Sequence, residues 1–308
     1  MRLSLLLLLL TSCSSQTEDK PSPEDFPGTG TFQVEIVPPN SKDPGQAAIL
    51  GRVLDGVNPS NVIWEVAATE GDCVLLTPRI PFCDPKCSSS EACVEDDECQ
   101  PYPTGIDVGT VTVEGIKTTA GETDFTMDPV AGYYQPAADI DLAYPPFAEG
   151  DAIVFSASGN EEVVPFTMTA QGIVPFEIIT ESITLEDGKS VEIEWIPGGL
   201  PDLAVINLSV NISYHAGTKG TISCETPDSG AIELPSTMVD ALKDLGLSGW
   251  PMIVFSRTIT GATEPELPVD LIIESSMTQN VNIPGLISCN TDADCPEDQT
   301  CQLDFRCE

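Results

Sequence analysis

The segment LAVINLSVNISY, residues 203–214, decides the fold class of this chain. From Ala204 to Ile212 an apolar residue occupies every second position, and Asn or Ser fills most of the positions between them. Side chains of an extended chain point alternately to its two sides. The pattern therefore predicts a β-strand with one apolar and one polar face.

Nine further runs show the same alternation or an enrichment in β-branched residues. They are TFQVEIV at 31–37, AAILGRVL at 47–54, NVIWEVAA at 61–68, GTVTVEGIK at 109–117, DAIVFSAS at 151–158, IVPFEIIT at 173–180, SVEIEWI at 190–196, PMIVFSRT at 251–258 and VDLIIES at 269–275. The chain also holds 24 Gly and 27 Pro, which cluster between such runs. Short strands separated in this way are typical of β-sandwiches, so we expect a mainly β fold.

One segment, near 236–245, predicts a helix. Ser236 or Thr237 can cap its start, and Gly246 stands where a helix commonly stops. Met238, Leu242 and Leu245 lie near one face. This helix would lie between strands, as a crossover at the edge of a sandwich does.

The length of the chain allows two β-sandwich-like domains with two small disulfide-rich modules. We expect the first domain at 31–178, with a Cys-rich insertion at 73–102, and the second at 181–286. A Cys-rich module, 287–308, follows the second domain. One larger sandwich is the alternative.

The N-terminus carries a secretory signal. MRLSLLLLLL has one basic residue and a short apolar run, too short to span a bilayer. The tetrapeptide Leu10-Thr11-Ser12-Cys13 that follows resembles the lipobox of bacterial lipoproteins. This resemblance implies that a signal peptide, 1–12, is removed and that Cys13 becomes lipidated.

The resemblance also implies a location in the cell envelope. Ser14 after the cysteine favours the outer membrane or the cell surface in this class of protein. Residues 13–30 are rich in Ser, Pro, Gly and acids, so they predict a disordered tether that carries the lipid. Several acyl chains on Cys13 would hold the protein to the membrane, where a single chain would not.

An exported chain enters an oxidising compartment, where cysteines pair. Apart from Cys13, the sequence has two clusters of four cysteines and two others. The clusters are Cys83, Cys87, Cys93 and Cys99, and Cys289, Cys295, Cys301 and Cys307. Each predicts two disulfides, in one of three connectivities that the sequence leaves open. Cys73 and Cys224 either bridge each other, or Cys73 joins the first cluster and Cys224 stays free.

The two clusters have similar spacing, which suggests two copies of one module. They resemble the short Cys-rich, Asp-rich inserts of secreted proteins and lipoproteins of myxobacteria and their relatives. Zinc is disfavoured, because it prefers closely spaced Cys pairs separated by a longer segment, and the only histidine, His215, lies far away.

Calcium is the metal with the better case, and no other cofactor is expected. Asn290, Asp292 and Asp294 place oxygen atoms at alternate positions. An EF-hand loop that began at Asn290 would need Gly at its sixth position and an acid at its twelfth, where Cys295 and Cys301 stand. A looser calcium site is one interpretation, and solvated acids on a disulfide knot are the other.

The charge excludes one class of partner. The chain has 12 Lys and Arg against 49 Asp and Glu, a net charge of −37. Nucleic acids and anionic membrane surfaces bind basic patches, so we expect neither as an electrostatic partner.

The sequence offers two weak catalytic candidates. His215 would have to serve as the base of any catalytic triad, but no G-x-S-x-G elbow is present. Asp228-Ser229-Gly230 matches the short motif of aspartic proteases, which need two such carboxylates, and no second copy occurs. We therefore expect no enzyme.

The expected function is that of a non-enzymatic, lipid-anchored protein of the bacterial cell envelope. Its β-sandwich array would serve structure, adhesion or the binding of an extracellular protein or glycan. A calcium-dependent surface adhesion module and a secreted-type hydrolase are the alternatives.

Overall fold

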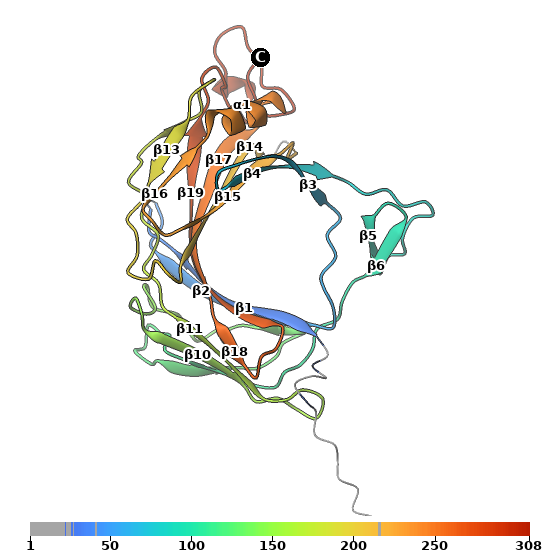
Figure 1. Ribbon diagram of the computed structural model, residues 1–308, viewed down its shortest axis with the longest axis vertical. Helices are drawn as coiled ribbons and strands as arrows, with labels where there is room; N and C mark the ends of the chain where they lie inside the picture. Colours follow the sequence, from blue (N-terminus) through green and yellow to red (C-terminus); the bar gives the residue numbers. More distant parts are fainter. Residues whose placement is uncertain (1–21, 23–25, 27, 41, 215–216) are drawn as a thin grey trace, which may run out of the picture.

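The computed structural model describes residues 22, 26, 28–40, 42–214 and 217–308, and it is built almost entirely of strands (Figure 1). A ten-stranded sheet runs in the order β3-β4-β15-β14-β17-β19-β1-β2-β9, with β12 also paired to β19. Its strands are β1 (Thr29–Val37), β2 (Gln46–Leu54), β3 (Ile63–Glu70), β4 (Cys73–Arg79), β9 (Tyr133–Tyr134), β12 (Ile183–Thr184), β14 (Val205–Tyr214), β15 (Thr221–Pro227), β17 (Trp250–Thr260) and β19 (Val269–Asn282).

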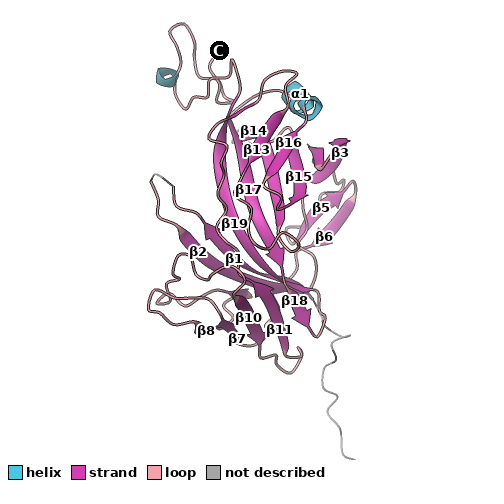
Figure 2. Ribbon diagram, turned by 60° about the vertical axis from the view of Figure 1, so that its left-hand side comes forward, coloured by secondary structure: helices cyan, strands magenta, loops and turns pink. Residues whose placement is uncertain are grey.

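Three smaller sheets complete the fold (Figure 2). The largest has five strands in the order β18 (Ala262–Glu264), β11 (Phe166–Gln171), β10 (Ala152–Ala157), β7 (Val111–Glu114) and β8 (Asp124–Met127). Two-stranded sheets join β13 (Val191–Glu194) to β16 (Ala231–Leu234), and β5 (Glu91–Glu95) to β6 (Glu98–Pro101). The predicted fold class, mainly β with sandwich-like layers and two disulfide-rich modules, is confirmed.

The ten-stranded sheet buries one face against two covering layers, and so forms two hydrophobic cores. In the first core Phe32 and Val34 of β1 meet Phe155 and Met168 of the five-stranded sheet. In the second, residues of β14, β15 and β17 meet β13, β16 and the helix α1 (Ser236–Asp244). Figure 1 shows both covering layers on the outer side of the bend of the sheet.

The cores draw residues from both sides of the expected boundary near residue 180. Ile259 and Ile273 belong to the first core, while Cys73 and Leu75 belong to the second. The cause is the length of β17 and β19, which have 11 and 14 residues. At about 3.3 Å per residue, such strands are long enough to run from one core into the other.

Most predicted strands are present, and one is not. The run 173–180 forms no strand except for a single bridge between Ile178 and Trp195. Phe176 is buried in the second core, but the carbonyls of Val174 and Pro175 face the guanidinium of Arg257. These backbone groups are therefore used by a side chain and are not available to a neighbouring strand.

The predicted helix is present, but its predicted cap is wrong. Pro235 is the N-cap residue, with no side-chain capping bond, and its carbonyl accepts the amides of Met238 and Val239. Ser236 and Thr237 lie inside the helix, and the Thr237 hydroxyl bonds the Glu70 carboxylate instead. Proline is tolerated at this position because its φ of −62° is the one its ring imposes and its missing N–H would have no partner at the start of a helix. In the described part of the chain, no helix has both the length and the apolar character needed to cross a membrane.

The body begins before residue 31. Phe26 packs edge-on against Phe166, with ring centroids 6.0 Å apart, and β1 begins at Thr29. β1 then runs antiparallel to β2 and parallel to β19, with Gly30 opposite Val269 and Ile36 opposite Ser275. Phe26 is thus packed against the first core.

Candidate functional site

The first Cys-rich module is a hairpin closed by two disulfides. Cys83 pairs with Cys93 and Cys87 with Cys99, with Cα–Cα distances of 6.0 and 5.6 Å. Strands β5 and β6 place Cys93 directly opposite Cys99. The module begins only at Cys83, because β4, inside the expected insertion 73–102, is a strand of the large sheet.

The C-terminal module has the same connectivity. Cys289 pairs with Cys301 and Cys295 with Cys307, with Cα–Cα distances of 5.8 and 5.5 Å. Its third and fourth cysteines also face each other in an antiparallel bridge. Of the three connectivities that the sequence leaves open, both modules adopt the one that joins first to third and second to fourth.

The backbones of the two modules turn at the same position. Asp97 and Phe305 each lie four residues after the third cysteine, and each has φ of 63°. Left-handed backbone is uncommon for residues other than glycine. The shared turn, together with the shared connectivity, makes the two segments copies of one structural module.

Each module is attached to the body through polar contacts. Arg79 at the end of β4 contacts Glu65 of β3 and Glu95 and Asp96 of the first module at 2.9 to 3.0 Å. The hydrogen bond to Glu95 is the main cause that raises the pKa of Arg79. In the C-terminal module the carbonyl of Asp304 accepts the amide of Gly249 at 2.6 Å.

Cys73 and Cys224 bridge each other. They lie at paired positions of β4 and β15, and both are almost fully buried in the second core. The bond joins residues 151 positions apart in the sequence. It ties β4, which precedes the expected boundary, to a strand that follows it.

The metal candidates are engaged in other bonds. Two groups of three sulfur atoms lie close enough to hold a metal, but every one of these sulfurs belongs to a disulfide. Asp294 accepts the amides of Asn290 and Thr291, which together lower its pKa. Asp292, in the short η2 helix (Asp292–Asp294), accepts the amide of Cys301 at 2.8 Å. These two carboxylates bond the backbone of the module.

Asp228 lies in a buried polar cluster. One oxygen accepts the indole N–H of Trp195 at 2.7 Å, and the other accepts the amide of Gly198 at 2.9 Å and Nε of Arg257 at 2.8 Å. Arg257 also donates to the carbonyl of Ile196 at 2.6 Å, and the side chains of Asp228 and Arg257 are 0 and 1% exposed. Asp228 is thus surrounded by protein donors. This arrangement suits a structural role.

Two residues singled out in the sequence, Cys13 and His215, lie outside the described residues. So do all residues of the lipobox.

The side of the large sheet that faces away from the two cores, the inner side of its bend, forms a regular polar surface. We call "the open face" the grid that β14, β15, β17 and β19 present away from the second core. Residues paired across these strands form three rows. The rows are Thr221, Asn211, Met252 and Asn280; Ser223, Ser209, Val254 and Thr278; and Glu225, Asn207, Ser256 and Ser276.

Nine of the twelve residues of the open face are Ser, Thr or Asn, and only Glu225 is charged. By contrast, 20% of the whole chain is charged. Among the described residues, four of these side chains are at least partly exposed and form no hydrogen bond with the protein: Asn207, Ser223, Thr278 and Asn280. Their donors and acceptors are therefore available to a ligand.

A hollow of about 450 Å³ adjoins one end of the open face. Trp250 and Asn280 line it, together with Asn282 and Ser288. Trp250 stands two residues before Met252 on β17, so its indole lies on the same side of the sheet and is partly exposed. The rest of its lining is mostly apolar and includes Pro251 and Leu286, so the hollow combines an aromatic ring and apolar walls with the unbonded amide of Asn280.

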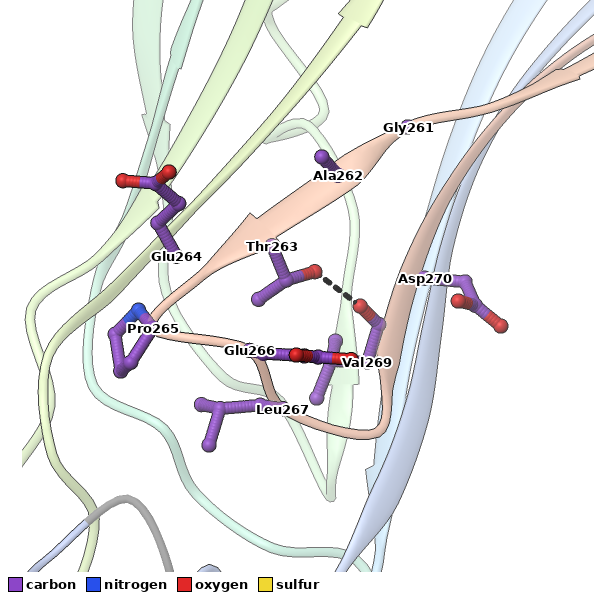
Figure 3. Close-up of a pocket in the computed structure, with 9 residues that line it drawn as sticks. All are labelled: Gly261, Ala262, Thr263, Glu264, Pro265, Glu266, Leu267, Val269 and Asp270. Carbon is purple, nitrogen blue, oxygen red and sulfur yellow. Dashed lines mark hydrogen bonds between the residues drawn. The ribbon is translucent and has the colours of Figure 1, made fainter.

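A second hollow lies where the chain turns from β18 into β19 (Figure 3). Three carboxylates border it, those of Glu264, Glu266 and Asp270. The side chains of Glu264 and Asp270 point to opposite sides, and the Thr263 hydroxyl donates to the carbonyl of Val269 (Figure 3). These acids do not converge on one point.

Sequence reasoning missed the polar cluster and the open face. Arg257 gave a signal, because it is a charged residue inside the apolar run PMIVFSRT. For the open face, the sequence signal was limited to the Asn and Ser positions of LAVINLSVNISY. The rows of the face depend on pairings between strands that are far apart in the sequence.

No known protein family matches the sequence, and neither does any curated protein. Among solved structures, 11 chains match. One is the crystal structure of the FN1–FN3 domains of chicken CNTN1, with 8% identity over 79% of this chain and 83% of that chain. The TM-score of this match is 0.21, so the likeness carries no argument.

Proposed function

We propose that this chain is a lipid-anchored protein of a bacterial cell envelope, located at the outer membrane or the cell surface. Its β-sandwich body binds an extracellular ligand, a protein or a glycan, and catalyses no reaction. The observation that carries the proposal is the use of the cysteines. All ten cysteines among the described residues pair with each other, which leaves only Cys13, the residue that follows Leu10-Thr11-Ser12.

The pairing supports export from the cytoplasm. Disulfides persist in oxidising compartments and are rare elsewhere. The two modules depend on them, because segments of about 20 residues with few apolar side chains cannot be held by burial alone. A chain built in this way and preceded by an apolar signal is suited to the outside of the cell.

The surroundings of Asp228 argue against its use as the catalytic carboxylate of a hydrolase. Both of its oxygens accept bonds from Trp195, Gly198 and Arg257, and its side chain has no exposed surface. A catalytic carboxylate must reach its substrate directly or through one water molecule.

Mass spectrometry of the mature N-terminus tests the anchor. We expect a chain that begins at Cys13 and carries acyl groups, and palmitate labelling that Cys13→Ser abolishes while Ser14→Ala retains it. An unmodified Cys13, or cleavage at another position, would contradict the proposal.

A further inference from the structure

We propose that the open face and its adjoining hollow bind a neutral glycan chain, with one sugar ring stacked on Trp250. The inference deepens the proposed function and rests on it, because it names the chemical class of the extracellular ligand. Four arguments support it: the absence of charge on the face, its free polar groups, its rigidity and its aromatic residue.

The absence of charge selects against ionic ligands. Eleven of the twelve residues of the open face are uncharged in a chain whose net charge is −37. A polyanion would be repelled by the chain as a whole, and a polycation would gain more from the acid-rich surfaces elsewhere. A neutral ligand neither meets electrostatic repulsion on this face nor gains more by binding to another surface of the chain.

The polar groups match a polyhydroxylated ligand. The amides of Asn207 and Asn280 and the hydroxyls of Ser223 and Thr278 each offer donors and acceptors, and none is used by the described protein. Sugar hydroxyls need partners of both kinds. The only strongly exposed apolar side chain of the open face is Val254, 38% exposed, which is too little for an apolar protein partner.

The sheet holds these groups at fixed spacing. Four strands at about 4.8 Å and three rows at about 7 Å make a surface about 14 Å across in each direction, large enough for a short oligosaccharide. The strands are joined by continuous backbone pairing and backed by the second core. A ligand would therefore meet groups that are already ordered, at little entropic cost.

The hollow supplies the stacking partner. The partly exposed indole of Trp250 lies beside the free amide of Asn280, within a space of about 450 Å³. An aromatic ring buries much area at low conformational cost, and polar groups beside it fix the orientation of the ligand. A ring seated there would continue along the row of Met252, Asn211 and Thr221.

Affinity electrophoresis of the full mature protein in native gels tests the proposal. The gels contain dextran, a soluble β-glucan or a galactomannan, with dextran sulfate as the anionic comparison. We expect at least one neutral glycan to retard the protein and dextran sulfate to leave it unretarded. For that glycan, Trp250→Ala and Asn280→Ala should each weaken binding by about 2- to 10-fold.

Two matched variants serve as controls. Asn290→Ala removes an exposed amide of the C-terminal module that belongs to neither the open face nor the hollow, and Tyr102→Ala removes a ring that is 53% exposed outside both. Both should bind as the unmodified chain does. Because Asn280 is exposed and unbonded, its variant stays folded even if Trp250→Ala does not.

Three results of the binding assay would overturn the proposal. They are no retardation by any neutral glycan, retardation by dextran sulfate alone, and equal binding by the Asn280→Ala and Asn290→Ala proteins. A dimer in sedimentation that Asn280→Ala dissociates would assign the face to a second copy of the chain, and would also overturn it. None of these results depends on the lipid at Cys13, so failure here is distinct from failure of the anchor.

Discussion

The buried cluster around Asp228 predicts a large and asymmetric response to mutation. Asp228→Asn keeps the shape of the side chain and removes its charge, which leaves the guanidinium of Arg257 buried without an anion. Breaking a buried ion pair by removing one partner costs about 3–5 kcal/mol of unfolding free energy. Arg257 keeps the carbonyls of Ile196 and Val174 as acceptors, at 2.6 and 3.2 Å. We therefore expect the lower part of that range, about 3 kcal/mol.

The same structure predicts how the loss depends on the partner. In Arg257→Met, Asp228 still accepts the indole of Trp195 and the amide of Gly198, but its charge is unpaired. The double variant removes both charges, and replacing a buried pair by uncharged groups is commonly close to neutral. It should therefore lose much less than the sum of the two single variants, which is the result of a double-mutant cycle for residues in contact.

Urea unfolding and thermal melts measure these differences. A loss of about 3 kcal/mol corresponds to a Tm lower by roughly 5 °C for a chain of 308 residues, because the unfolding entropy is about 2.1 cal/mol/K per residue. Asp139→Asn, at an exposed acid, is the control and should stay within about 0.5 kcal/mol of the unmodified protein. A loss of less than about 1 kcal/mol for Asp228→Asn, or single losses that simply add, would refute the view that this pair holds the second core.

Three further predictions concern ionisation and cross-linking. Burial raises the pKa of Tyr134 to about 12. The unfolded chain releases this proton near pH 10, so the stability contributed by Tyr134 falls as the pH rises above 10, and a titration at 295 nm should show a late step that Tyr134→Phe removes. Non-reducing peptide mapping should show first-to-third and second-to-fourth bonds in both modules. The double variant Cys73→Ala/Cys224→Ala removes the disulfide between β4 and β15 and should lower the free energy of unfolding by about 2–5 kcal/mol. An unfolding free energy unchanged within error would contradict the view that this disulfide stabilises the second core.

Local pattern carried most of the fold prediction. Alternation in LAVINLSVNISY corresponds to β14, where Ile206, Leu208 and Val210 are buried. Period-two alternation determines which side chains share a face, but it is silent about which strands become neighbours. The pairing of β1 with β19, about 240 residues away, therefore had no local signal.

The two errors in the fold prediction, the boundary near residue 180 and the strand at 173–180, have the same cause. A boundary near residue 180 follows from counting strands along the chain, but β17 and β19 contribute to both cores. The run 173–180 has strand-like composition, yet Arg257 takes the carbonyls of Val174 and Pro175. In both cases a contact distant in sequence outweighs a local preference.

The spacing of the cysteines predicted which four belong to each module, but not which of them pair. The turns at Asp97 and Phe305 place the third and fourth cysteines opposite each other, yet each of these bonds a cysteine of the preceding segment. The open face could not be predicted from local sequence, because each of its rows combines residues of four strands.

The parallel pairing of β1 with β19 has a mechanical consequence. The two strands run side by side from Gly30 and Val269 to Ile36 and Ser275. A pull on the N-terminal end of β1, while the second core is held at the far end of β19, draws the strands past each other along their length. All backbone hydrogen bonds between the two strands then bear the load at the same time, whereas in a strand peeled away from one end they break one after another. A protein tethered at its N-terminus and held at its second core would therefore transmit tension through the paired strands β1 and β19, in the direction in which they resist separation.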